Sequence, residues 1–173
     1  ITTSADGAFS VYAVDVDGDG DMDVLSASIE DDKIAWYEND GSENFTAHVI
    51  TTSADGAASI YAVDVDGDGD VDVLSASNKD GKITWYENNG SESFTVHTIT
   101  TSADGAPSVY AVDVDGDGDM DVLSASSNDD KIAWYENDGS ESFTAQTITT
   151  SADGAYSVYA VDVDGDGDMD VLS

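Results

Sequence analysis

The chain contains no cysteine and no arginine, a single proline, and only four lysines among 173 residues. Without cysteine there can be no disulfide framework. The 38 acidic residues leave a formal net charge of −34, which repels nucleic-acid phosphates, so we expect no nucleic-acid partner. No apolar run reaches about 18 residues, so no membrane insertion is predicted. Hydrophobic residues make up 40% of the chain, which is enough to build a core and argues against disorder.

The sequence repeats itself every 49 residues. The segment Ile-Thr-Thr-Ser-Ala-Asp-Gly begins each repeat, and it defines repeats 1–49, 50–98 and 99–147 and a partial repeat 148–173. The first and third repeats are identical at 43 of 49 positions. Because the chain opens inside a repeat, we expect it to be a processed, excised or engineered piece of something longer.

Each repeat supplies four segments rich in strand-forming residues, separated by Asp-Gly and Asn-Asp-Gly turns. In the first repeat these segments are 10–16, 23–28, 33–38 and 45–51. A period of about 40 to 50 residues with several short strands per unit is typical of propeller blades. We therefore predict an all-β fold, a β-propeller of four-stranded blades with 3.5 near-identical repeats per chain. Residues 1–173 would form a single repeat domain, half of a closed propeller.

The most specific motif is an acidic loop of nine residues between the first two strands of each repeat. In the first repeat it reads Asp15-Val-Asp-Gly-Asp-Gly20-Asp-Met-Asp23, and it recurs at 64–72, 113–121 and 162–170. Carboxylates at alternate positions can converge on Ca²⁺, which takes six to eight oxygen ligands at about 2.3 to 2.6 Å. Glycine at the sixth position lets the chain turn back through φ > 0.

This loop is not an EF-hand, because position 12 is serine and the flanking segments are strand-like. We predict that the side chains at positions 1, 3, 5 and 9 bind calcium, with the backbone carbonyl at position 7 as a fifth ligand and its carboxylate spare. One ion per repeat gives about four Ca²⁺ per chain. The predicted metal-binding residues are Asp15, Asp17, Asp19, Asp21, Asp23, Asp64, Asp66, Asp68, Asp70, Asp72, Asp113, Asp115, Asp117, Asp119, Asp121, Asp162, Asp164, Asp166, Asp168 and Asp170.

The alternative for these loops is a solvated acidic turn, since Asp and Gly favour turns without any metal. Two carboxylates 4 Å apart repel by up to about 4 kcal/mol at an effective dielectric of 20, so four such turns without a cation would be costly. Calcium binding is the favoured interpretation.

The pattern Asp-x-Asp-x-Asp-Gly-x-x-Asp, followed by Ile-Ala-Trp-Tyr-Glu-Asn-Asp-Gly, resembles the FG-GAP/VCBS repeats of integrin α-like β-propellers. The resemblance covers the whole chain and is closer to the bacterial VCBS type, because Gly105-Ala106-Pro107 is the single match to Gly-Ala-Pro. It implies a calcium loop between the two innermost strands of each blade, rings that usually have seven blades, and an extracellular or cell-surface protein.

Three functions are compatible with this sequence. The first is a calcium-stabilised module for adhesion that binds a glycan or a protein on the face opposite the calcium loops. The repeats differ mostly there, at residues 9, 58, 107 and 156 and at 29–30, 78–79 and 127–128. The second is a structural or idealised scaffold without its own ligand. The third, a polysaccharide-lyase type enzyme, is disfavoured because no catalytic constellation stands out, so we expect no enzymatic activity.

Two further expectations concern the aromatic residues and the assembly. The tryptophans Trp36, Trp85 and Trp134 would pack between blades, with sugar stacking as the alternative, and His48 and His97 would be surface residues of the fourth strand. The partial repeat leaves open blade faces and strand edges, which favours association with a second copy. We predict a homodimer that closes a ring of seven or eight blade positions. In a symmetric ring of eight, the segment 1–3 of the partner would complete the partial blades, whereas a ring of seven would be asymmetric or would rebuild its half-blades.

Overall fold

The computed structural model describes residues 1–173, and every regular element in it is a β-strand. The first sheet contains β1 (Ala8–Val14), β2 (Asp23–Ser28), β3 (Lys33–Asn39) and β4 (Phe45–Thr51). The second contains β5 (Ala57–Val63), β6 (Asp72–Ser77), β7 (Lys82–Asn88) and β8 (Phe94–Thr100). The third contains β9 (Ser108–Val112), β10 (Asp121–Ser126), β11 (Lys131–Asn137) and β12 (Phe143–Thr149). A two-stranded sheet, β13 (Tyr159–Val161) with β14 (Asp170–Leu172), follows.

Each sheet is an antiparallel meander in which consecutive strands are neighbours. The all-β prediction and the four-stranded units are therefore confirmed. The predicted first strand, 10–16, was displaced: β1 begins at Ala8 and ends at Val14. The strand ends earlier than predicted because the N–H of Val16 donates to Oδ2 of Asp23 at 3.0 Å, so Val16 belongs to the acidic loop and not to the strand ladder.

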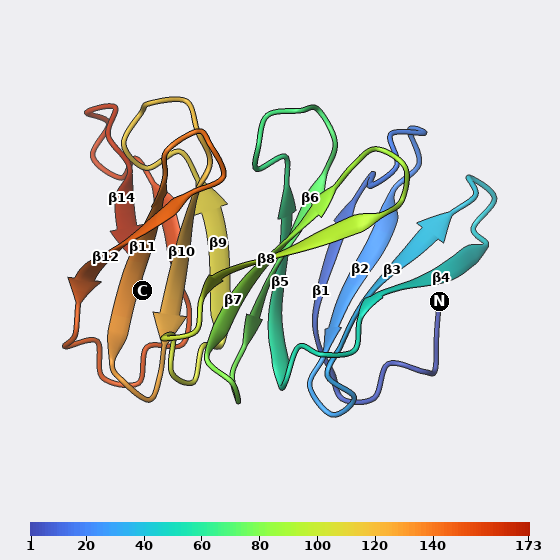
Figure 1. Cartoon of the computed structure of the whole chain (residues 1–173), viewed down its shortest axis with the longest axis horizontal. Coiled ribbons are helices and arrows are strands. Elements are labelled where there is room, and N and C mark those ends of the chain that lie inside the picture. The colour runs from blue at the N-terminus through green and yellow to red at the C-terminus, as the bar shows by residue number, and fades with distance from the viewer.

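The sheets stand side by side and bury their faces against one another (Figure 1). Between the first two sheets, Leu25, Ile34 and Trp36 pack with Ile60 and other residues of the next sheet in one core cluster. Equivalent clusters lie between the second and third sheets and between the third sheet and the β13–β14 pair. Because both faces of a middle sheet are covered, every residue of β6 and the central residues 83–86 of β7 are buried.

The first strands of successive sheets, β1, β5, β9 and β13, lie next to one another. Their tyrosines, Tyr12, Tyr61, Tyr110 and Tyr159, form a continuous row with ring centroids 4.7 to 5.2 Å apart, a spacing typical of favourable aromatic pairs. Hydrogen bonds reinforce the row, since the N–H groups of Ile60, Val109 and Val158 each donate to a serine Oγ of the preceding first strand.

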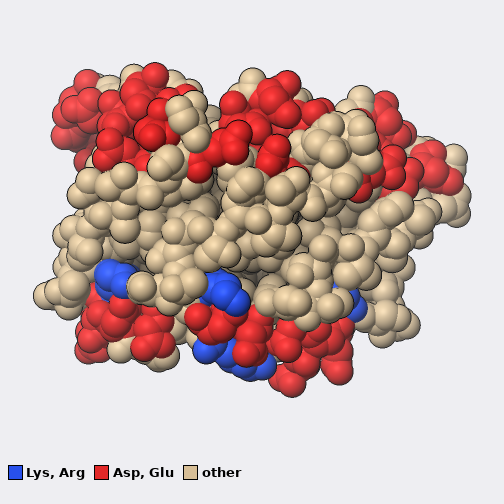
Figure 2. Space-filling model, viewed as in Figure 1, with Lys and Arg blue, Asp and Glu red and all other residues tan.

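The turns divide between two edges of the molecule. The acidic loops and the turns between third and fourth strands occupy the upper edge in Figure 1, and the remaining turns occupy the lower edge. Figure 2 shows acidic residues massed along both edges, while lysines appear only along the lower one. The chain thus presents a purely anionic edge and a mixed edge.

Candidate metal centre

The acidic loops are held open by hydrogen bonds from their own backbone. In the first loop, Asp15 accepts from the N–H groups of Gly18 at 2.8 Å and Gly20 at 2.9 Å. Asp17 and Asp19 each accept from the N–H two residues further on, as Asx turns do. Gly20 has φ +97°, so the left-handed conformation predicted at the sixth position is present, and Gly18 has φ +76° as well. The same pattern recurs in all four loops.

The ninth position is a buried carboxylate that ties the loop to the sheet. Asp72 is 0% exposed; its Oδ2 accepts from the N–H of Val65 at 3.0 Å, and its Oδ1 accepts from the N–H of Asn88 at 2.7 Å. Asp23 and Asp121 make the same pair of bonds. Asp170 makes only the first. The carboxylate at the last position of the loop therefore binds the backbone near the loop's start and also the backbone at the end of the third strand.

The structure brings three carboxylates of each loop together, with oxygens within 4.8 Å of one another. The groups are Asp15, Asp17 and Asp19 in the first repeat; Asp64, Asp66 and Asp72 in the second; Asp113, Asp115 and Asp121 in the third; and Asp162, Asp164 and Asp170 in the fourth. Each group can hold a metal ion, and an all-oxygen donor set suits a hard cation such as calcium. Positions 1 and 3 gather in every loop, position 5 only in the first, and position 9 only in the other three.

The carboxylate at position 7 joins none of these groups. In the first repeat it lies against Gly41, in the turn between β3 and β4, so closely that a Cβ on Gly41 would collide with Asp21. Asp70 and Asp119 pack in the same way on Gly90 and Gly139. This is the position at which we predicted that only the backbone carbonyl would serve as a ligand.

Burial makes four of the gathered carboxylates costly in the ionised form. It raises the pKa of Asp72 to about 6, although hydrogen bonds from the backbone of Asn88 and Val65 act in the opposite direction. Burial also raises the pKa of Asp121, Asp17 and Asp66, and neighbouring carboxylates add to the effect for Asp17 and Asp66. A bound cation would reverse this balance, because an opposite charge nearby favours the charged form.

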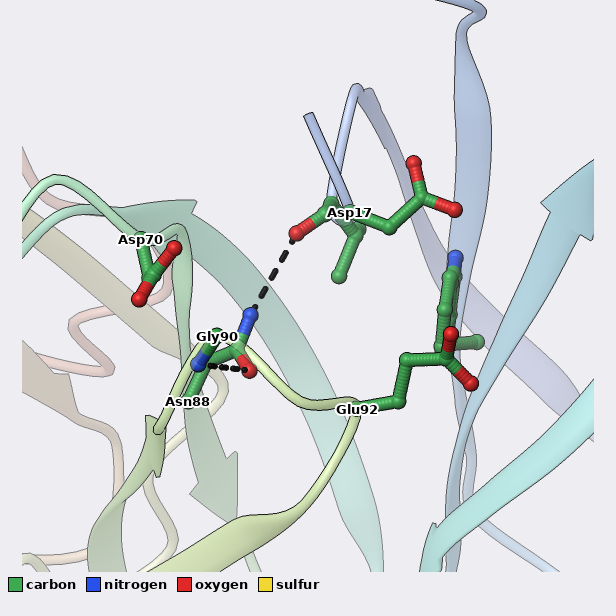
Figure 3. A pocket seen from close by; sticks show the side chains of 7 residues that line it. Asp17, Asp70, Asn88, Gly90 and Glu92 are labelled. Atoms are coloured by element: carbon green, nitrogen blue, oxygen red, sulfur yellow. Dashed lines mark hydrogen bonds between the residues drawn. The ribbon is translucent and has the colours of Figure 1, made fainter. Parts of the chain in front are cut away.

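Asn88 is a supporting residue that the sequence reasoning missed. Its Nδ2 donates to the carbonyl of Val71 at 3.2 Å. It also donates, across to the first repeat, to the carbonyl of Val16 at 3.3 Å (Figure 3). Figure 3 also shows Asp17 and Glu92 around the same small hollow, which has a volume of about 70 Å³. The signal was an asparagine 16 residues after the ninth-position Asp in each full repeat.

The lower edge carries a larger hollow of about 350 Å³. Its lining consists of the invariant Gly105 and of residues at which the repeats differ: Phe9, Ile29, Ala58, Asn78, Pro107, Ser127, Asn128 and Tyr156. The predicted variable positions thus converge on one place, on the edge opposite the acidic loops.

The tryptophans are packing residues and not sugar platforms. Trp36 is 1% exposed and Trp85 is 0% exposed, and both lie in the clusters between sheets. Trp134 is only partly buried, in the cluster beside the two-stranded sheet. His48 and His97 lie on the fourth strands, as predicted, and their side chains are about one-third exposed.

Two solved structures have a similar fold. One is an Agrocybe aegerita lectin described by its specific recognition of non-reducing terminal N-acetylglucosamine; it matches with a TM-score of 0.63 and 18% identity over 93% of this chain and 46% of that chain. The other is the V. cholerae biofilm matrix protein Bap1, with a TM-score of 0.57 and 26% identity over 94% of this chain and 23% of that chain. The chain thus spans less than half of either protein. No curated protein matches it in sequence.

The repeats themselves match a known sequence family. The model of the FG-GAP-like repeat matches residues 15–75, 64–124 and 113–173, and each match runs from one acidic loop through the next. Together the three matches cover all but the first 14 residues. The chain therefore belongs to the FG-GAP-like repeat family.

Proposed function

We propose that this chain is a calcium-dependent, non-enzymatic binding module that holds a glycan in the hollow opposite its acidic loops. The observation that carries the proposal is the convergence of the variable turns on that hollow. Loops on a rigid scaffold commonly carry binding, and here the scaffold is nearly invariant while the lining of the hollow changes from repeat to repeat.

The chemistry of the hollow favours a sugar. Phe9 and Tyr156 are 51% and 64% exposed, so two aromatic rings are available for the apolar face of a sugar ring. Asn78, Asn128 and Ser127 add amide and hydroxyl groups for sugar hydroxyls. A few polar groups among apolar ones in a hollow of this size are typical of small-ligand sites. The similarity to a lectin and to a biofilm matrix protein supports the same interpretation.

Calcium fits the acidic loops as the ion that stabilises this scaffold. Their carboxylates offer oxygens only, and the raised pKa values of Asp17, Asp66 and Asp72 mark sites that gain from a cation. Extracellular calcium modules bind with a Kd of about 10⁻⁴ to 10⁻³ M, so such loops would fill outside the cell. We therefore place the module in an extracellular or cell-surface protein. The structure contains no helix able to cross a bilayer.

Replacing an aromatic residue of the hollow should weaken glycan binding without affecting the fold. For Tyr156→Ala we expect a loss of about tenfold in affinity, equivalent to about 1.4 kcal/mol, measured on a glycan array and then by titration with the best ligand. The matched control is Val96→Ala, because Val96 is also exposed, at 58%, but lies on the outer strand β8.

The absence of any glycan signal for the wild type on the array would contradict this proposal and leave two alternative functions. A protein ligand, retained by the same hollow, would appear as binding that Tyr156→Ala abolishes. A purely structural scaffold would show neither, and chelation would change its stability and nothing else.

We also propose that the sheets are blades of a β-propeller closed by a second copy of the chain. Val11 on β1 is 70% exposed, whereas the equivalent Ile60 and Val109 are 5% exposed because a preceding sheet covers them. At the other end, Val163 is 62% exposed, whereas Val16 is 3% exposed beneath the following sheet. A head-to-tail partner would cover both faces.

Light scattering in calcium is expected to give a particle of twice the 18.0 kDa chain mass. Val11→Lys should shift the population toward monomer, because it places a charge in the proposed contact. A monodisperse wild-type particle of 18.0 kDa would contradict the homodimer.

A further inference from the structure

A second cluster of ligand atoms lies between the second and third sheets, and the acidic-loop motif does not include it. The carboxylates of Glu87 and Glu141 and the imidazole of His97 have ligand atoms within 4.8 Å of one another. Glu87 lies on β7 and His97 on the neighbouring β8, where Nε2 of His97 is 2.7 Å from Oε2 of Glu87. Glu141 comes from the next sheet, in the turn between β11 and β12.

The imidazole is held in a fixed orientation. Its ring stacks on the buried Trp85, with centroids 4.5 Å apart and planes 26° from parallel. The side chains of His97 and Glu87 are 32% and 26% exposed, so solvent and ions can reach them. A tetrahedral zinc site with bonds of about 2.0 to 2.1 Å needs ligand atoms about 3.3 Å apart, which small rotations of the two glutamates can provide.

The neighbouring repeats offer an internal comparison. Glu38 and His48 make the same pair at 2.8 Å with the same stacking on Trp36. Glu92 is the sequence equivalent of Glu141, but it does not gather with Glu38 and His48 as Glu141 does with Glu87 and His97. Trp36 and Glu92 also line the hollow of about 70 Å³ in Figure 3, and Nε1 of Trp36 is buried without a hydrogen-bond partner. Glu141 lines the equivalent hollow between the second and third sheets, which is also about 70 Å³, so that interface has room for the water of a hydrated ion.

The third repeat breaks the pattern. There Gln146 replaces the histidine, and its Nε2 lies 3.3 Å from Oε2 of Glu136. The strand pairing around Gln146 is the same as around His97, so the fold does not need the histidine. Histidine and glutamine differ here in their ability to bind a metal, because a neutral imidazole is a good metal ligand and the primary amide of glutamine is a poor one.

We propose that Glu87, His97 and Glu141 form a binding site for a transition-metal ion of the zinc type, separate from the calcium loops, which links the second and third sheets. A mixed nitrogen and oxygen donor set favours zinc, cobalt or nickel over calcium, because calcium takes oxygen ligands almost exclusively. Three protein ligands leave a fourth position for water. Two carboxylates beside one imidazole also provide the negative charge that balances a divalent cation.

The test is a titration with Zn²⁺ and with Co²⁺ while excess Ca²⁺ competes for the acidic loops. For the wild type we expect saturable binding and, with Co²⁺, the visible absorption of a nitrogen-ligated ion. His97→Gln copies the residue of the third repeat, so it should fold and keep its calcium binding. We expect it to lose zinc affinity by more than the roughly 10- to 100-fold that removal of an outer-shell partner costs.

Two further variants locate the site. His48→Gln is the matched control, because it removes the other histidine and should leave the ion at His97 in place. Glu141→Gln should weaken zinc binding although Glu141 belongs to the next sheet. Equal zinc affinity in wild type and His97→Gln would overturn the proposal, and so would a Glu141→Gln variant that binds zinc as tightly as wild type.

Discussion

Removing calcium is expected to lower the free energy of unfolding by about 6 kcal/mol. At a Kd of about 10⁻⁴ M and about 1 mM Ca²⁺, each of the four loops contributes about 1.4 kcal/mol. The total is comparable with the whole stability of many domains, about 5 to 15 kcal/mol. For a chain of this size the melting midpoint should fall by about 10 to 25 °C, measured by circular dichroism with a chelator.

The control for this melt is ionic strength, since a chain with a net charge of −34 is stabilised by any salt that screens its self-repulsion. Sodium chloride at matched ionic strength should recover little of the lost stability, and calcium added back over the chelator should recover nearly all of it. A midpoint that does not move on chelation at low salt would contradict a stabilising role for the ion.

Asp72→Ala is expected to be the most damaging single substitution in a loop, at about 5 kcal/mol. It leaves the N–H groups of Val65 and Asn88 without their acceptors inside the protein, and each orphaned donor costs about 1 to 3 kcal/mol. It also removes one oxygen from the group formed with Asp64 and Asp66. Urea unfolding in calcium measures the sum of both effects.

Asp70→Ala is the matched control, two residues away in the same loop. The Asp70 carboxylate packs beside Gly90, outside the group of gathered carboxylates, so its loss should change stability by no more than about 0.5 kcal/mol. If Asp70→Ala were as destabilising as Asp72→Ala, the assignment of roles along the loop would be wrong.

The features that could be predicted from sequence are those set by local pattern. Gly20 and the alternating acids define the turn without help from distant residues. The strands that follow can be recognised in the sequence by their apolar and small residues. The end of β1 was predicted two residues too late because Val16 looks like a strand residue. Its N–H bonds to the side chain of Asp23, seven residues away, and this bond was not visible in the residue pattern.

The features that escaped prediction depend on pairs of residues far apart in the sequence. The meeting of Glu141 with His97 requires both the order of the sheets and the curvature of a turn. The anchoring of Asn88 on Val16 crosses from one repeat to another. Near-identical repeats made such contacts harder to predict. The same residue types occur in every repeat, so the sequence does not show which repeat supplies each partner of a contact.

The most direct test of the central claim is a calorimetric calcium titration of the wild type and of Asp66→Ala. Asp66 belongs to the carboxylate group of the second loop but accepts only the local N–H of Asp68, so its loss should spare the fold. We predict about four calcium ions per wild-type chain, one for each acidic loop, and one fewer in the variant. No saturable calcium binding, or an unchanged number of ions in Asp66→Ala, would contradict the assignment of these loops as calcium sites.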